Sequence, residues 1–144
     1  MPERPRLLVV LSNTNFTTGL VAASGALAVT VLGESQAHLL APLGLRSGRE
    51  SDKLQGLPFQ LALNEAPVFP EGAAGWLIAE VLSATPLGDS TAFLAAVRER
   101  EDGAAPALTW QAAKAVVGED FLRQWSEKSL REQAAARAAM HWRD

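Results

Sequence analysis

Two apolar runs of strand-like composition, residues 77–81 and 91–97, flank a turn-forming stretch at residues 86–89 (PLGD). Runs of this kind around a turn that contains Pro and Gly predict two antiparallel neighbouring strands. Residues 6–12 and 26–32 are also rich in residues that favour strands. Strands dominate the first two thirds of the chain, without the strand–helix alternation of a doubly wound parallel sheet. We therefore expect a mainly β fold of the α+β class, an antiparallel barrel with short inserted helices.

Helical patterns occur between these strands and at the end of the chain. Residues 16–23 carry apolar side chains at helical spacing and are followed by a Ser-Gly stop signal. The composition of residues 34–44 predicts a second helix, and that of residues 119–140 predicts a long helix. A chain of 144 residues has the length of one ordinary domain. We expect the barrel to occupy residues 1–104, with a helical extension at residues 105–144 that packs on the barrel or on a partner subunit.

The composition argues against several classes of function. The sequence has no cysteine and only two histidines, His38 and His141, so a disulfide framework is excluded and a metal centre is not expected. A formal net charge of -3 disfavours nucleic acid as a partner, because binding to phosphate backbones needs a basic face. The apolar run at residues 7–11 is too short for a membrane span or a signal-peptide core. We therefore expect a cytoplasmic protein that binds neither nucleic acid nor membrane.

Familiar catalytic motifs do not occur in the sequence. It contains no nucleophile elbow, no GxxxxGK phosphate loop and no GxGxxG dinucleotide fingerprint. His38 and His141 lie far apart in the sequence, and neither has a Ser or Cys in a triad-like setting. The sequence therefore assigns no catalytic residue.

Hydroxyl and amide side chains gather where the first strand gives way to the first helix. A helix start presents unpaired N–H groups and a partial positive charge, which suit a phosphate or a ring carbonyl. The same residue types also cluster at helix starts as ordinary caps, so both interpretations stay open on composition alone. The residues concerned are Ser12, Asn13, Thr14, Asn15, Thr17 and Thr18.

Positive charge for such an anion must come from another part of the chain. No lysine or arginine lies between Arg6 and Arg46. The polar segment at residues 46–57 reads as a surface loop and carries Arg46, Arg49 and Lys53. These side chains are the nearest cations in the sequence that could reach a phosphate held by the hydroxyl cluster.

The order of these pieces resembles the flavin reductase-like family of FMN-binding split barrels. The resemblance covers residues 5–97 and includes a Thr-x-x-x-Val helix at residues 17–21 and a Ser-Gly turn. The sequence DKLQG at residues 52–56 is similar to the family's Asp-Lys-Phe-x-Gly element. Residues 66–68 (APV) and 88–90 (GDS) take the places of its Gly-x-Pro-x-Leu and Gly-Asp-His elements.

The resemblance implies a split β-barrel and a homodimer that holds FMN near the subunit interface. It also implies a flavin reductase-like oxidoreductase, in which hydride passes between NAD(P)H and the flavin. The cofactor then performs the chemistry, so a catalytic triad is not required. The cofactor-binding residues expected on this basis are Ser12, Asn13, Thr14, Asn15, Thr17, Thr18, Arg46 and Lys53.

The sequence also departs from the family pattern. Members usually have two earlier strands that contribute to the flavin site, whereas this chain begins almost directly at the strand after them. The family's common Asn is Thr30 here, its His is Ser90, and a residue that is often charged is Ala22. These departures favour an alternative, a degenerate split barrel without cofactor that acts as a structural or interaction module.

Overall fold

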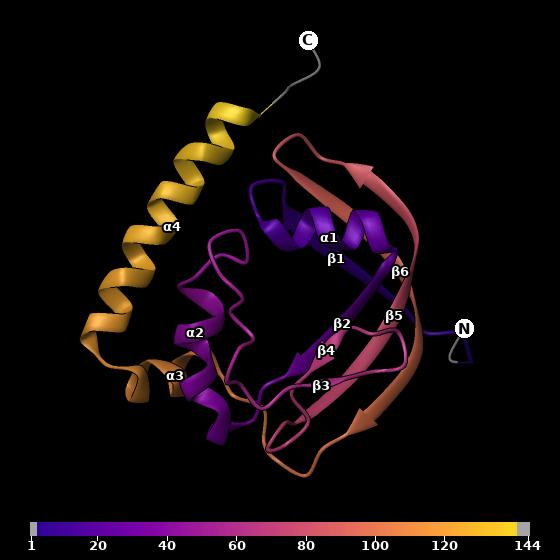
Figure 1. Cartoon of the computed structure of the whole chain (residues 1–144), viewed down its shortest axis with the longest axis horizontal. Coiled ribbons are helices and arrows are strands. Elements are labelled where there is room, and N and C mark those ends of the chain that lie inside the picture. Colours follow the sequence, from indigo (N-terminus) through magenta and orange to yellow (C-terminus); the bar gives the residue numbers. More distant parts are fainter. Residues whose placement is uncertain (1–2, 141–144) are drawn as a thin grey trace.

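Four strands form a curled antiparallel sheet in the computed structural model, which describes residues 3–140 (Figure 1). The strand order is β1-β6-β5-β2, so that the two long strands are central and the two short ones are at the edges. The strands are β1 (Arg6–Ser12), β2 (Ala26–Val31), β5 (Gly75–Pro86) and β6 (Ser90–Asp102). The curled antiparallel sheet with its helices confirms the predicted α+β fold class.

The long β5–β6 hairpin contains two β-bulges, which bend the sheet. The register shifts at Ile78/Ala79 and at Val81/Ser83 leave Arg98 and Leu82 as the extra residues. A bulge bends its strand and increases the local twist, so two of them in one hairpin produce strong curvature. The predicted antiparallel arrangement of the runs 77–81 and 91–97 is confirmed, within a longer hairpin in which Leu77 and Ile78 pair with Arg100 and Glu99 beyond the second run.

One face of the sheet packs against helix α1 (Phe16–Ser24). Val21 of this helix is buried against Phe93 and Ala95 of β6, together with residues of β2 and β5. The predicted stop after the helix is confirmed, because Gly25 adopts a left-handed conformation with φ 66° and its N–H binds the carbonyl of Val21. The packing of Val21 holds α1 against this face of the sheet.

The long segment between β2 and β5, residues 32–74, contains only short helices and strands. The predicted helix at residues 34–44 forms as the 3-10 helix η1 (Glu34–Leu39) followed by α2 (Leu40–Gly44). The predicted loop at residues 46–57 contains no helix or strand. A two-stranded ribbon of β3 (Gln60–Leu61) and β4 (Pro67–Val68) comes next.

A buried glutamine joins η1 to the segment that follows β4. The side chain of Gln36 is 3% exposed, and its Oε1 accepts a hydrogen bond from the N–H of Gly33. Its Nε2 donates to the carbonyl oxygens of Phe69 and Glu71, at 2.9 Å each. Because three backbone groups find their partner in one side chain, Gln36 fixes the position of the whole η1–α2 segment.

The C-terminal region consists of α3 (Trp110–Val117) and α4 (Glu119–Ala139), which Gly118 separates as predicted. Trp125 of α4 lies against Trp110 and Phe121, with ring centroids 5.8 and 5.7 Å away. A Cβ atom on Gly44 would lie 2.6 Å from Cζ3 of Trp125, so α4 approaches the backbone of α2 closely. The boundary at residue 104 stays a prediction. No helix among residues 3–140 is both long and apolar enough to cross a membrane.

We predict that Gln36→Ala lowers the free energy of unfolding by about 3 kcal/mol, because it leaves buried backbone groups without partners. Urea denaturation monitored by circular dichroism measures this change. Gln133→Ala removes the same side chain from an exposed position on α4 and should cost less than about 0.5 kcal/mol. Equal losses in the two variants would contradict the role assigned to Gln36.

Candidate functional site

Hydrogen bonds among hydroxyl groups shape the loop between β1 and α1. Oγ of Ser12 and Oγ1 of Thr14 lie 2.9 Å apart, and Oγ1 of the buried Thr18 donates to the carbonyl oxygen of Ser12. Asn15 occupies the N-cap position of α1, but its side chain makes no capping hydrogen bond. The side chain of Asn15 therefore does not act as a helix cap in the described structure. The side chains of Ser12 and Thr18, in contrast, hold the loop in place.

Asn13 connects the same loop to the turn of the β5–β6 hairpin. Its N–H donates to the carbonyl of Asp89 at 2.9 Å, and its Nδ2 donates to the carbonyl of Gly88 at 3.3 Å. Its Oδ1 accepts a hydrogen bond from the hydroxyl of Thr91 at 2.7 Å. The hydroxyl loop and the Gly88-Asp89-Ser90 turn thus lie side by side, although more than seventy residues separate them.

A small polar cavity of about 160 Å³ lies beside this loop. Five of the eight residues predicted to bind a cofactor line it, which are Thr14, Asn15, Thr17, Arg46 and Lys53. Arg49, the other cation of the 46–57 loop, donates from Nη1 to the carbonyl of Thr14 and so joins the two loops. The other three predicted residues, Ser12, Asn13 and Thr18, do not line the cavity and instead fix the loop that does.

A larger, mainly apolar cavity of about 670 Å³ adjoins the polar one. It lies between α1, β2 and the turn that joins β3 to β4, and Leu20, Leu27 and Pro67 are among its lining residues. The two cavities share four lining residues, which are Phe16, Thr17, Gly48 and Lys53. A cavity of this size is within the range of small-molecule and cofactor sites. Together the two spaces suit a ligand with an anionic end and a flat apolar body.

The charge around the polar cavity is mainly positive. Arg46, Lys53 and Lys128 line it together with one acidic residue, Glu132, which pairs with Lys128. The pKa of Lys53 is lowered, first by its burial and second by the positive charge of Lys128. Nζ of Lys53 donates to the carbonyl of Leu43 at 2.9 Å, which directs the ammonium group toward α2. An anion placed among these cations would be stabilised by direct charge attraction.

The sequence did not identify Lys128 and Glu132 as site residues. They are four positions apart on α4, and a Lys–Glu pair at this spacing is typical of a solvent-exposed helix face. No pattern within α4 distinguishes this pair from the exposed pairs that Arg123 forms with Asp120 and Glu127. Only the packing of α4 against α2 brings Lys128 to the cavity.

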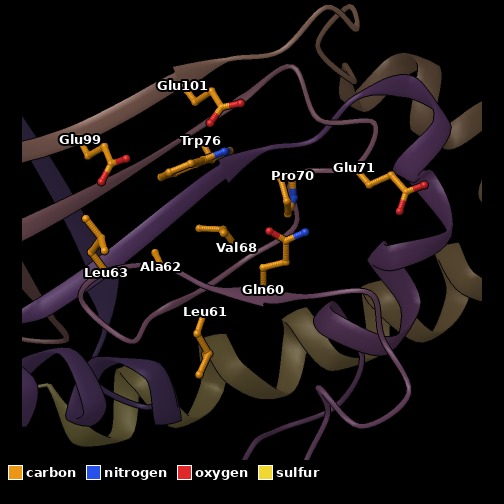
Figure 2. Close-up of a pocket in the computed structure, with 10 residues that line it drawn as sticks. All are labelled: Gln60, Leu61, Ala62, Leu63, Val68, Pro70, Glu71, Trp76, Glu99 and Glu101. Carbon is orange, nitrogen blue, oxygen red and sulfur yellow. The ribbon is translucent and has the colours of Figure 1, made fainter.

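A third cavity, of about 560 Å³, has the opposite charge character (Figure 2). Trp76, Glu99 and Glu101 of the β5–β6 hairpin line one side of it, and Leu61 and Val68 of the β3–β4 ribbon are among the residues that line the other. It shares no lining residue with the other two cavities. Its glutamates make it unsuitable for an anionic ligand.

His38 lines neither the polar nor the apolar cavity. The Nδ1 atom of His38 lies 3.0 Å from the carbonyl oxygen of Ser35, a local contact within η1. His141 lies outside the described residues. Among residues 3–140, no group of three or more His, Cys, Asp and Glu residues is arranged to hold a metal ion.

Comparison with known proteins found one matching family model and several similar solved structures. The model of the flavin reductase like domain family matches residues 2–117. An FMN-binding protein from Thermus thermophilus is 29% identical with a TM-score of 0.63, and the match covers 71% of this chain and 57% of that one. The NADH:FAD oxidoreductase of Streptomyces globisporus is 20% identical with a TM-score of 0.68, over 74% of this chain and 64% of that one. A flavoredoxin from Methanosarcina acetivorans is 18% identical with a TM-score of 0.63, over 69% and 54% of the two chains.

This chain thus spans less than two thirds of the length of each of these three structures. No match was found among curated proteins.

We predict that stability depends on pH through Lys53. Between its lowered pKa and the ordinary value of 10.5, Lys53 binds fewer protons in the folded chain than in the unfolded chain. The free energy of unfolding should therefore rise with pH across this interval, and Lys53→Met should abolish that part of the rise.

Urea denaturation of both proteins from neutral pH to the alkaline side measures the difference. Lys114→Met, which removes an exposed lysine from α3, should keep the dependence that Lys53 causes. Parallel pH profiles for the wild type and Lys53→Met would contradict the burial of a charged ammonium group at this site.

Proposed function

Because the chain belongs to the flavin reductase-like domain family, we propose that it binds FMN in the two adjoining cavities and acts as a flavin reductase-like oxidoreductase. The family match and the structural neighbours support a flavin-related redox function. The choice of FMN, the use of NAD(P)H and the site itself are parts of this proposal.

The observation that carries the proposal is the contact between a cationic cavity and an apolar one. The flavin phosphate would lie in the polar cavity, within reach of Arg46, Lys53 and the hydroxyls of Thr14 and Thr17. The isoalloxazine ring would lie in the apolar cavity, against Leu20 and its neighbours. The start of α1 adds backbone N–H groups and a partial positive charge at the phosphate end.

A small polar cavity favours FMN over FAD. Its volume of about 160 Å³ suits a single terminal phosphate, whereas the adenylate of FAD would have to extend beyond it. When bound, the flavin would supply hydride chemistry with NAD(P)H, and the protein's own groups would bind and orient it. Direct evidence on the nicotinamide partner would come from assays with NADH and NADPH.

A cofactor-free module is the second candidate, and two hydrogen bonds favour it. Oγ1 of Thr30 accepts a hydrogen bond from the N–H of Phe69 at 3.1 Å, and Oγ of Ser90 donates to Asp89 at 3.0 Å. These are the positions at which the resembling family has Asn and His, and here both side chains have partners within the fold. Such a protein would have kept the scaffold while losing flavin contacts.

A homodimer also belongs to the proposal, and the outer face of the sheet supports it. Leu8 of the edge strand β1 lies opposite Leu94 of β6, and their exposed fractions are 65% and 38%. Val10, two residues further along the same face, is 53% exposed. Apolar side chains beside an unpaired strand edge favour association with a second copy. The cytoplasmic location and the lack of nucleic-acid and membrane partners stay predictions.

We predict that the purified protein binds FMN more tightly than riboflavin, because only FMN carries the phosphate. Lys53→Gln and Arg46→Gln should each weaken FMN binding by about 10-fold, as expected for one charge-assisted contact. Quenching of flavin fluorescence during titration measures both affinities. Arg100→Gln removes an exposed arginine from β6, outside both cavities, and should bind FMN as the wild type does. A protein that binds neither flavin would rule out this function and leave the cofactor-free module.

We predict that the protein sediments as a dimer and that Leu8→Glu shifts it toward monomer, because a charge on the apolar face opposes its burial. Analytical ultracentrifugation over a concentration series measures this shift. Leu130→Glu is a matched control, since Leu130 is 64% exposed and belongs to helix α4 instead of the sheet. Dimers of equal stability in both variants would exclude this face as the interface.

A further inference from the structure

We propose that Lys128 of helix α4 is a third cation of the phosphate site, so that the C-terminal helix completes the FMN pocket. This inference rests on the proposed function. It concerns a part of the chain that the family match does not reach, because that match ends at residue 117 and α4 begins at Glu119. The contribution of α4 is therefore not a property that the family assignment carries with it.

The side chain of Lys128 is directed toward the body of the protein. Lys128 lines the polar cavity together with Arg46 and Lys53, and its side chain is 25% exposed. Arg123 on the same helix is 60% exposed, although it also forms pairs with acidic neighbours. Lys128 thus differs from an ordinary surface cation of α4 in both burial and position.

Aromatic packing holds α4 in the position that this role requires. Trp125, almost one helical turn before Lys128, packs on Phe121 and closely approaches the backbone of Gly44. Gly44 itself lines the polar cavity, so the contact that anchors α4 lies at the edge of the site. Figure 1 shows α4 running past α2 toward the end of the molecule at which α1 begins.

The charges at the cavity are arranged as an anion site would require. The positive charge of Lys128 contributes to lowering the pKa of Lys53, so the two ammonium groups are close enough to repel each other. A phosphate between them would remove this repulsion and would gain attraction to both. Glu132 pairs with Lys128 in the structure and opposes an incoming anion, so the two α4 residues have opposite expected effects on affinity.

The test measures flavin affinity in variants of the full-length protein. Lys128→Gln should weaken FMN binding by about 10-fold and leave riboflavin binding unchanged, because riboflavin lacks the phosphate. Glu132→Gln should tighten FMN binding, again without an effect on riboflavin. Arg131→Gln is the matched control, since Arg131 is an exposed cation of the same helix that does not line the cavity.

A second readout separates the failure of this inference from the failure of the proposed function. Inorganic phosphate should raise the melting temperature of the wild type more than that of Lys128→Gln. If Lys128→Gln matches the wild type with FMN and with phosphate, while Lys53→Gln weakens FMN binding, the role of Lys128 is overturned and the flavin site stands. If the wild type binds neither flavin but phosphate stabilises it through Lys128, the anion site stands and the flavin function is overturned.

Discussion

The bend of the β5–β6 hairpin is the constraint on which the rest of the structure depends. The bulges at Leu82 and Arg98 curl the two longest strands, and the short strands attach at opposite ends of them. Strand β1 pairs with the part of β6 next to the turn, whereas β2 pairs with the first half of β5. Helix α1 connects these two strands across the curled face, so its N-terminus must lie beside the hairpin turn. That geometry places the hydroxyl loop at one end of the sheet, where Asn13 binds the turn.

The candidate site combines groups that are distant in the sequence. Its positive charge therefore comes from segments other than the hydroxyl loop. The hydroxyl loop lies in a stretch without lysine or arginine, so its positive neighbours come from the 46–57 loop and from α4. Burial makes a lysine costly to keep charged, and the lowered pKa of Lys53 reflects that cost. Placing several cations around one polar cavity lowers the stability of the fold but favours the binding of an anion. The arrangement therefore indicates a binding site.

Local sequence signals predicted most of the fold, and they brought together part of the candidate site. The β5–β6 pairing, the helix stop at Gly25 and the break at Gly118 follow from turn chemistry and periodicity, which act over a few residues. Arg46 and Lys53 were expected near the hydroxyl loop and line the same cavity as Thr14 and Thr17. Three further predicted residues, Ser12, Asn13 and Thr18, support the loop without lining the cavity. Lys128 could not be predicted, because its place depends on the contact of Trp125 with Gly44, which connects distant segments.

The central claim is that a flavin phosphate lies among the cations of the polar cavity. A crystal structure of the protein grown with FMN tests this most directly. We expect electron density for the phosphate within hydrogen-bonding distance of Lys53 and Arg46, with the ring between α1 and the β3–β4 turn. Density for FMN with its phosphate in solvent, or with the ring in the acidic cavity around Trp76, would contradict it.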